Sequence, residues 1–334
     1  MKKQLLFSCF LFGWWAVCCT AAADFYMVAG TTPVKKEIKS IPYTISSPGF
    51  YYIAKDVLCA PGHHGITVAS DDATIDLMGF TMTGPGTGTN HGIYMNARSN
   101  VEIRNGTVTH FGSNGIYEQS QSSGRDHRIY NIRARSNRGG GIIIFGKGAH
   151  IEDCTASGNT EQGIFAGMGS KVVGNTALEN GEDGIYGNGG NLVARNVSAE
   201  NSGYGIFAAN GSTITGNVVY NNDQSGIYAA SGCTVTDNSS AWNLMSGIEA
   251  GATTWAGAVV SGNTCYGNKH HGIVAGNATI IRGNTCYSND YHGIFLAYHS
   301  FVDKNIAYAN NQSLGTYLNI SECYSCTFGL NHDP

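Results

Sequence analysis

Residues 184–204 read GIYGNGGNLVARNVSAENSGY, and residues 205–225 read GIFAANGSTITGNVVYNNDQS. Both segments are 21 residues long, begin with Gly-Ile, and carry Asn at the same two offsets. Their β-branched stretches are three to five residues long, which is too short for helices. A fixed period of this length indicates stacked repeats of short strands.

The same signature extends over most of the chain. Gly-Ile pairs begin at Gly65, Gly92, Gly115, Gly141, Gly163, Gly184, Gly205, Gly226, Gly247, Gly272 and Gly293. Asn precedes the Ile by five residues at Asn137, Asn159, Asn180, Asn201, Asn222, Asn243, Asn268 and Asn289. A second Asn precedes it by ten residues at Asn175, Asn196, Asn217, Asn238, Asn263 and Asn284.

This repeat predicts an all-β, single-domain parallel β-helix with three short strands in each of about 11 turns of 21–27 residues. Asn and Gly tolerate the left-handed backbone of tight corners, and stacked Asn amides can hydrogen-bond from turn to turn. Each Ile is expected to point inward, the next residue outward, and the third inward again. Each turn adds about 4.8 Å to the length of the stack.

Three further segments carry a family resemblance. They are YTISSPGFYYI at 43–53, GITV at 65–68 and TIDLMGF at 74–80. Together with the Gly-Ile and Asn columns, they resemble the secreted right-handed parallel β-helix repeat proteins of the pectate-lyase-like superfamily. The resemblance implies the hand of the coil. It leaves the activity open, because such proteins include lyases, hydrolases, epimerases and adhesins.

The two ends of the chain differ from the repeat. Residues 1–23 combine early Lys residues, a short apolar run and Ala21–Ala23, which is typical of a secretory signal peptide. We therefore expect a secreted or periplasmic monomer without an integral membrane span. Residues 24–60 are expected to form an N-terminal cap and entry strands, residues 61–316 the β-helix, and residues 317–334 a C-terminal cap.

Charge is sparse and uneven. Only 13% of residues are charged and the formal net charge is −4, which argues against a nucleic-acid partner. Residues 98–150 nevertheless hold eight cations against three acids. A basic patch on an acidic chain indicates an anionic ligand, and for this fold we expect an acidic polysaccharide.

The basic patch contains the candidate catalytic residues. β-Elimination or epimerisation of a uronate needs a cation at the carboxylate and a base for the C5 proton. Arg125 or Arg133 could provide the cation, and His127 or Tyr117 the base. Further substrate contacts are expected from Arg128, Arg135 and Arg138. Glycoside hydrolysis is less favoured, because it calls for a carboxylate pair that the pattern does not show.

A column of outward side chains follows the Ile of each turn. Its aromatic members include Tyr94, Tyr117, Phe165, Tyr186, Phe207 and Tyr228. These rings could stack on sugar faces, or they could pack on one another as a cross-strand ladder. Glu249 interrupts the column near Trp255, and both are candidate sugar contacts.

Cysteine and metal candidates are few. Cys265 and Cys286 share an inward position on consecutive turns and could be bonded, and Cys323 and Cys326 could staple the C-terminal cap. No cofactor is indicated with certainty. Calcium near Glu179 and Glu200 and a metal at the His residues before Gly-Ile are weaker hypotheses. Two functions remain open: a polysaccharide lyase or epimerase, and a non-catalytic glycan-binding or adhesion rod.

Overall fold

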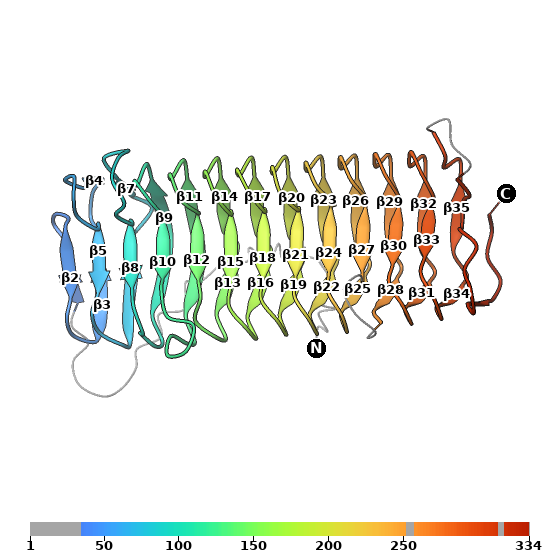
Figure 1. Ribbon diagram of the computed structural model, residues 1–334. Coiled ribbons are helices and arrows are strands. Elements are labelled where there is room, and N and C mark those ends of the chain that lie inside the picture. Colours follow the sequence, from blue (N-terminus) through green and yellow to red (C-terminus); the bar gives the residue numbers. More distant parts are fainter. Residues whose placement is uncertain (1–34, 252–256, 313–316, 334) are drawn as a thin grey trace, which may run out of the picture. The chain divides into compact units, whose positions relative to one another are not determined.

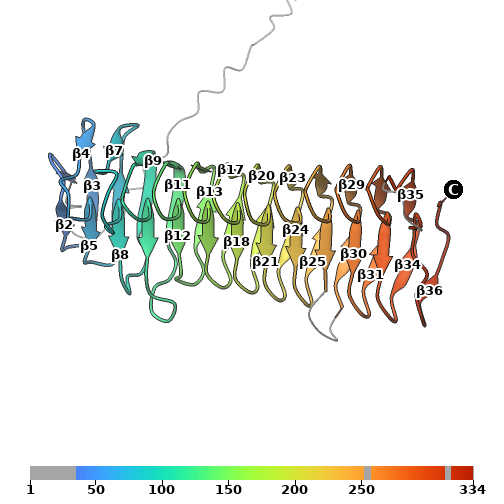
Figure 2. The same ribbon diagram turned by 45° about the horizontal axis from the view of Figure 1, so that its top comes forward.

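A computed structural model describes residues 35–251, 257–312 and 317–333. Over these residues the chain winds into a parallel β-helix, one strand of each of three sheets per turn, as Figures 1 and 2 show. The predicted fold class is therefore confirmed. No helix in this part of the chain is long and apolar enough to cross a membrane. The predicted signal peptide, residues 1–23, lies outside the described residues.

Sheet 1 contains the Gly-Ile strands. Its 12 parallel strands are β2 (Tyr43–Ile45), β5 (Ile66–Val68), β8 (Ile93–Met95), β10 (Ile116–Glu118), β12 (Ile142–Ile144), β15 (Ile164–Ala166), β18 (Ile185–Gly187), β21 (Ile206–Ala208), β24 (Ile227–Ala229), β27 (Ile248–Ala250), β30 (Ile273–Ala275) and β33 (Ile294–Leu296). The stack has one turn more than the Gly-Ile count suggests, because β2 begins with Tyr43 and still pairs in register with β5.

The other strands form one continuous 24-stranded sheet with two faces, which we call sheet 2 and sheet 3. Two long strands, β9 (Glu102–Thr109) and β11 (Arg128–Arg135), run through both faces and join them. Each long strand turns at an Asn with positive φ, Asn105 and Asn131.

Each face keeps its own ladder of parallel pairs. Sheet 2 contains β1 (Lys35–Glu37), β3 (Gly49–Tyr52), β6 (Ala73–Asp76), β13 (His150–Glu152), β16 (Lys171–Val173), β19 (Leu192–Ala194), β22 (Thr213–Thr215), β25 (Thr234–Thr236), β28 (Val259–Ser261), β31 (Ile280–Arg282), β34 (Phe301–Asp303) and β36 (Thr327–Phe328). Sheet 3 contains β4 (Val57–Leu58), β7 (Thr81–Thr83), β14 (Thr155–Ser157), β17 (Thr176–Leu178), β20 (Val197–Ala199), β23 (Val218–Tyr220), β26 (Ser239–Ala241), β29 (Thr264–Tyr266), β32 (Thr285–Tyr287) and β35 (Ile306–Tyr308).

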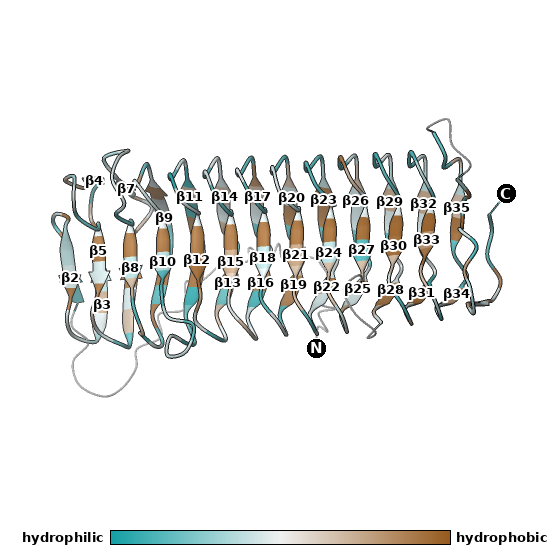
Figure 3. Ribbon diagram, viewed as in Figure 1, coloured by the Kyte–Doolittle hydropathy of each residue, from teal (hydrophilic) through white to brown (hydrophobic). Residues whose placement is uncertain are grey.

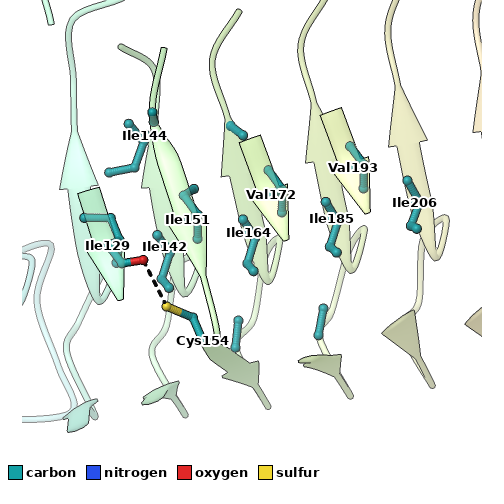
Figure 4. Close-up of a cluster of buried hydrophobic side chains, with 14 of the residues drawn as sticks. Ile129, Ile142, Ile144, Ile151, Cys154, Ile164, Val172, Ile185, Val193 and Ile206 are labelled. Carbon is teal, nitrogen blue, oxygen red and sulfur yellow. Dashed lines mark hydrogen bonds between the residues drawn. The ribbon is translucent and has the colours of Figure 1, made fainter. Parts of the chain in front are cut away.

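The interior is a continuous apolar column. Ile185 pairs in register with Ile206, and Ile206 with Ile227, and all three are fully buried. Figure 4 shows how Ile164, Ile185 and Ile206 of sheet 1 face Val172 and Val193 of sheet 2 across the narrow core. Hydrophobic segments accordingly lie along the strands and hydrophilic ones at many corners (Figure 3). The predicted inward and outward alternation is confirmed.

Buried Asn amides hold two corners of the turns, in ladders that begin at Asn137 and Asn175. In the ladder that precedes sheet 1, Nδ2 of Asn180 donates to Oδ1 of Asn201 at 2.9 Å. In the ladder between sheets 2 and 3, Nδ2 of Asn196 donates to Oδ1 of Asn217 at 3.0 Å. Each Oδ1 also accepts a backbone N–H from the neighbouring turn. The corners are therefore satisfied internally and present a fixed scaffold for the side chains outside.

Candidate functional site

The column of outward rings on sheet 1 forms a ladder. Phe165 and Tyr186 stack at 4.9 Å between centroids, Tyr186 and Phe207 at 4.5 Å, and Phe207 and Tyr228 at 5.0 Å, all within 10° of parallel. Their faces cover one another, so only edges remain for a ligand. Of the two interpretations of this column, sugar stacking and packing of the rings on one another, the structure shows the second.

The N-terminal end of this ladder includes imidazoles. Tyr117 stacks on His91 at 4.3 Å and lies 6.2 Å from the ring of Tyr94. Burial raises the pKa of Tyr117, which weakens it as a base near neutral pH. Tyr94 Oη donates to Oε1 of Gln119 at 2.6 Å. These contacts anchor the rings against the side of sheet 1.

His127 does not lie at the surface. Its side chain is fully buried, its Nδ1 atom accepts the N–H of Val101 at 3.3 Å, and its Nε2 atom is buried with no hydrogen-bond partner in the described structure. Burial lowers the pKa of His127 to about 4. A base must reach the substrate proton, so assigning His127 as the C5 base is wrong for this arrangement.

The arginines expected to work together lie in different places. Arg125 is exposed at the corner between sheets 1 and 2, where it lines a shallow pocket with Ser122, Asp126 and Lys147. Arg128 lies on sheet 2 and pairs with Glu102 at 3.2 Å. Tyr117, Arg125 and Arg133 therefore project from sheet 1, a corner and sheet 3, and the predicted catalytic set does not converge.

Sheet 3 carries the remaining cations. Arg133 and Arg135 are both exposed on β11, and the Nε atom of Arg133 donates to Oγ1 of Thr107 at 3.0 Å. Arg138 is exposed at the following corner. Within the described residues, no carboxylate lies within 4.0 Å of the guanidinium of Arg133, Arg135 or Arg138, in contrast to Arg104, which pairs with Asp76 at 2.8 Å.

Loop 119–127 is preceded by a buried acidic residue, Glu118, which the sequence pattern did not single out. Glu118 is fully buried at the third, inward position of β10; its Oε1 atom accepts the backbone N–H of Ser120 at 3.0 Å, and its Oε2 atom is buried with no hydrogen-bond partner among the described residues. Burial raises the pKa of Glu118. The signal was visible in the repeat, since Gly-Ile-Tyr-Glu replaces the small third residue of most later turns.

Asp183 is a second residue that sequence reasoning missed. It stands immediately before Gly184, and its Oδ1 atom accepts the N–H of Tyr204 at 2.7 Å. Partial burial raises the pKa of this carboxyl to about 6, with Glu182 adding to the effect. Other turns place a different acceptor in the same column, such as Asn114 and Ser225, so the charge at Asp183 is a departure from the pattern.

The remaining candidates show mixed outcomes. Glu249 occupies the outward column of sheet 1 and accepts the hydroxyl of Ser225 at 2.5 Å, whereas Trp255 lies outside the described residues. Cys323 and Cys326 form a disulfide, and Cys265 and Cys286 pair in register as buried thiols. The structure contains no group of three or more His, Cys, Asp or Glu residues arranged for a metal among the positions it describes.

The family profile described as "Right handed beta helix region" matches residues 91–240 and 213–332. The chain belongs to this right-handed β-helix family. No curated protein sequence matches it significantly.

Several solved structures share the fold. The A-module of Azotobacter vinelandii mannuronan C-5 epimerase AlgE6 aligns with a TM-score of 0.59 at 15% identity, covering 85% of this chain and 91% of the epimerase module. The AlgE4 A-module from the same organism gives 0.55 at 15% identity, with 86% and 87% covered. The Dettilon tailspike protein gives 0.54 at 18% identity, with 85% and 60% covered. At such identities the likeness extends to the fold alone.

Proposed function

We propose that this chain is a polysaccharide-binding rod that holds an acidic glycan on sheet 3 through Arg133 and Arg135. The observation that carries the proposal is a pair of exposed guanidinium groups on one strand, with no carboxylate of the described residues within 4.0 Å. Three of the six other cations of the patch are paired with carboxylates: Arg98 with Asp71, Arg104 with Asp76 and Arg128 with Glu102.

The surroundings of this pair suit a sugar acid. Residues i and i+2 of a strand point to the same side about 7 Å apart, so the two guanidinium groups can address neighbouring carboxylates. Arg133 is flanked in register by Thr107 and Thr155, and Arg135 by Thr109 and Ser157. Guanidinium groups bind carboxylates through paired charge-assisted hydrogen bonds, and the hydroxyl groups of Thr155 and Ser157 are compatible with sugar hydroxyls.

The fold likeness supports the same ligand class. Two of the similar structures are named mannuronan C-5 epimerases, and mannuronan is a polyuronate. Binding is favoured over lyase or epimerase chemistry here, because His127 is buried and Tyr117 lies on a different sheet from Arg133.

Calorimetric titration of the purified chain with mannuronate hexasaccharide tests the proposal. Each charge-assisted contact contributes about 1.5–3 kcal/mol, so Arg133→Ala with Arg135→Ala should weaken binding at least about tenfold. Arg128→Ala is the matched control, since that exposed cation is already paired. Unchanged affinity in the double variant would contradict the proposal.

A second candidate function rests on Asp183. A carboxyl whose pKa is raised to about 6 is suited to general acid catalysis, and the adjacent Glu182 is a potential second carboxylate for glycoside hydrolysis. Asp183→Asn keeps the acceptor for the Tyr204 N–H and removes the proton chemistry. Release of reducing ends by the native chain that stops in this variant would support it, and no release from neutral or acidic glycans would exclude it.

We propose that the chain acts outside the cytoplasm. The predicted signal peptide supports export, because residues 1–23 combine early Lys residues with an apolar run and Ala21–Ala23. Amino-terminal sequencing of the exported protein tests this, and a mature chain beginning near Asp24 is expected.

A further inference from the structure

The corner that leads from sheet 3 to sheet 1 begins with a left-handed residue in ten successive turns. Their φ values lie between 51° and 65°. The column reads His110, Ser136, Gly158, Glu179, Glu200, Asn221, Trp242, Gly267, Ser288 and Ala309. A bulky side chain is a rare occupant of this backbone region, which favours Gly and Asn. Seven of the ten residues depart from that preference, and Trp242 has the largest side chain among them.

The indole of Trp242 is also poorly sheltered, since 54% of the residue is exposed. It meets the ring of Tyr266 edge to face, with centroids 5.0 Å apart and planes at 78°. Tyr266 itself stacks on Tyr287 at 5.1 Å and 3°. The indole is thus roughly perpendicular to the stacked rings of the ladder and is not stacked in it.

The next turn leaves room for this orientation. A Cβ atom at Gly267 would lie 2.6 Å from Cδ1 and 2.8 Å from Nε1 of Trp242, so a side chain there would displace the indole. Trp242 thus combines a strained backbone, an exposed ring and a neighbour that must lack a side chain. Such features cluster at binding sites, where strain is retained for function.

The chemistry around Trp242 selects its ligand. Glu200, Asn221 and Asp223, on the preceding turns, are exposed and offer oxygen and amide groups for hydrogen bonds. The two carboxylates disfavour an anion, and the nearby cation, Lys269 on the following turn, is already paired with Asp290 at 3.5 Å. Leu244 and Met245, exposed on the same turn, extend the apolar surface only locally. A stable protein interface needs about 800 Å² on each partner, so a protein ligand is disfavoured. A flat ring bordered by polar groups matches one sugar ring.

We infer that Trp242 is the platform of a binding subsite for a neutral pyranose residue of a polysaccharide. The sugar would place its C–H face on the indole and its hydroxyl groups toward Asn221 and Glu200. This subsite does not depend on Arg133 and Arg135, whose turn lies five turns away along the same edge, about 24 Å at the spacing of parallel strands.

The test is calorimetric titration of the full chain with cellohexaose, mannohexaose and xylohexaose, with mannuronate hexasaccharide in parallel. At least one neutral hexasaccharide should bind, and Trp242→Asn should weaken that binding at least tenfold. Asn suits the left-handed position, as Asn221 shows, so this variant should retain the native circular dichroism spectrum. Tyr324→Ala, at an exposed aromatic residue of the C-terminal cap, is the matched control and should bind normally.

Gly267→Ala provides an independent check, since it displaces the indole without removing it, and it should also weaken neutral-sugar binding. Mannuronate binding should not respond to Trp242→Asn, which separates this subsite from the one at Arg133. Absence of neutral-sugar binding, or equal affinity in native and Trp242→Asn chains, would overturn the inference. Loss of neutral-sugar binding in the Arg133→Ala, Arg135→Ala variant would overturn its independence.

Discussion

The Nδ2 atom of Asn201 donates a 3.0 Å hydrogen bond to Oδ1 of Asn222, which follows it by 21 residues. Asn201 in turn accepts the backbone N–H and the Nδ2 of Asn180. Both Asn201 and Asn222 are almost completely buried. Buried amides joined in this way fix the height of each turn, because a slipped turn would leave donors and acceptors unpaired.

Replacing Asn201 by Ala should lower the free energy of unfolding by roughly 2–4 kcal/mol, since several buried polar groups lose their partners. Urea unfolding followed by circular dichroism measures the effect as a lower midpoint. Asn210→Ala changes an exposed corner Asn and should shift stability by less than about 0.5 kcal/mol. Equal midpoints for the two variants would contradict a structural role for the buried ladder.

Two stacked histidine pairs should make the protein sensitive to acid. The Nδ1 atom of His91 accepts the backbone N–H of Asn114, and Nδ1 of His271 accepts the backbone N–H of His292, both at 3.2 Å, so both accepting imidazoles are neutral. Burial lowers the pKa of His91 and of His271 to about 4. The unfolded chain takes up these protons below about pH 6.5. Stability should therefore fall between pH 6.5 and pH 4 and then level off.

His91 and His271 are only half-buried, and their partial access to solvent reduces the effect, so we expect about 1 kcal/mol from each imidazole. Thermal unfolding at pH 7 and pH 4.5 measures it. His91→Asn with His271→Asn retains a side-chain acceptor, as Asn114 does in its own turn, and should flatten the pH dependence. A pH profile identical to the native one would show that these imidazoles do not control acid stability.

Trp242→Asn should leave the chain as stable as before or raise its stability by up to about 1 kcal/mol, because the left-handed backbone is relieved. Differential scanning calorimetry checks this. A stability loss above about 2 kcal/mol would mean that the indole serves packing with Tyr266 and is not held there for a ligand.

The thiols of Cys265 and Cys286 should stay reduced and unreactive in the folded protein. Both are fully buried, and burial raises the pKa of Cys265 well above its usual range. Iodoacetamide should modify these residues only after denaturation, without prior reduction, as read by peptide mass spectrometry. Peptides of Cys265 and Cys286 that remain linked and unmodified would instead support a disulfide between them.

The repeat period was sufficient to predict the main-chain architecture. Ile185, Ile206 and Ile227 recur at equal spacing, and a register shift by one residue would have exposed all three. The turn formed by Tyr43–Ile45 was harder to count, because it lacks a Gly-Ile pair. The strand Tyr43–Ile45 belongs to sheet 1 because it pairs with β5, and this pairing is a contact between turns that no local sequence pattern reveals.

The site residues were less predictable, because their environment depends on neighbouring turns. Arg128 is neutralised by Glu102, which lies 26 residues earlier, and His127 turns inward at the end of loop 119–127. The spacing that aligned Tyr186 with Phe207 also could not reveal the angle between their rings. The sequence does not single out Trp242, because its left-handed backbone conformation follows from the geometry of the corner and not from a local residue pattern.

The most direct measurement is a crystal structure of the protein with bound mannuronate hexasaccharide. We expect sugar carboxylates within about 3.2 Å of the guanidinium nitrogens of Arg133 and Arg135, on the outer face of sheet 3. An oligosaccharide lying along the Tyr186 and Phe207 ladder of sheet 1, with both arginines left in solvent, would contradict the proposed function.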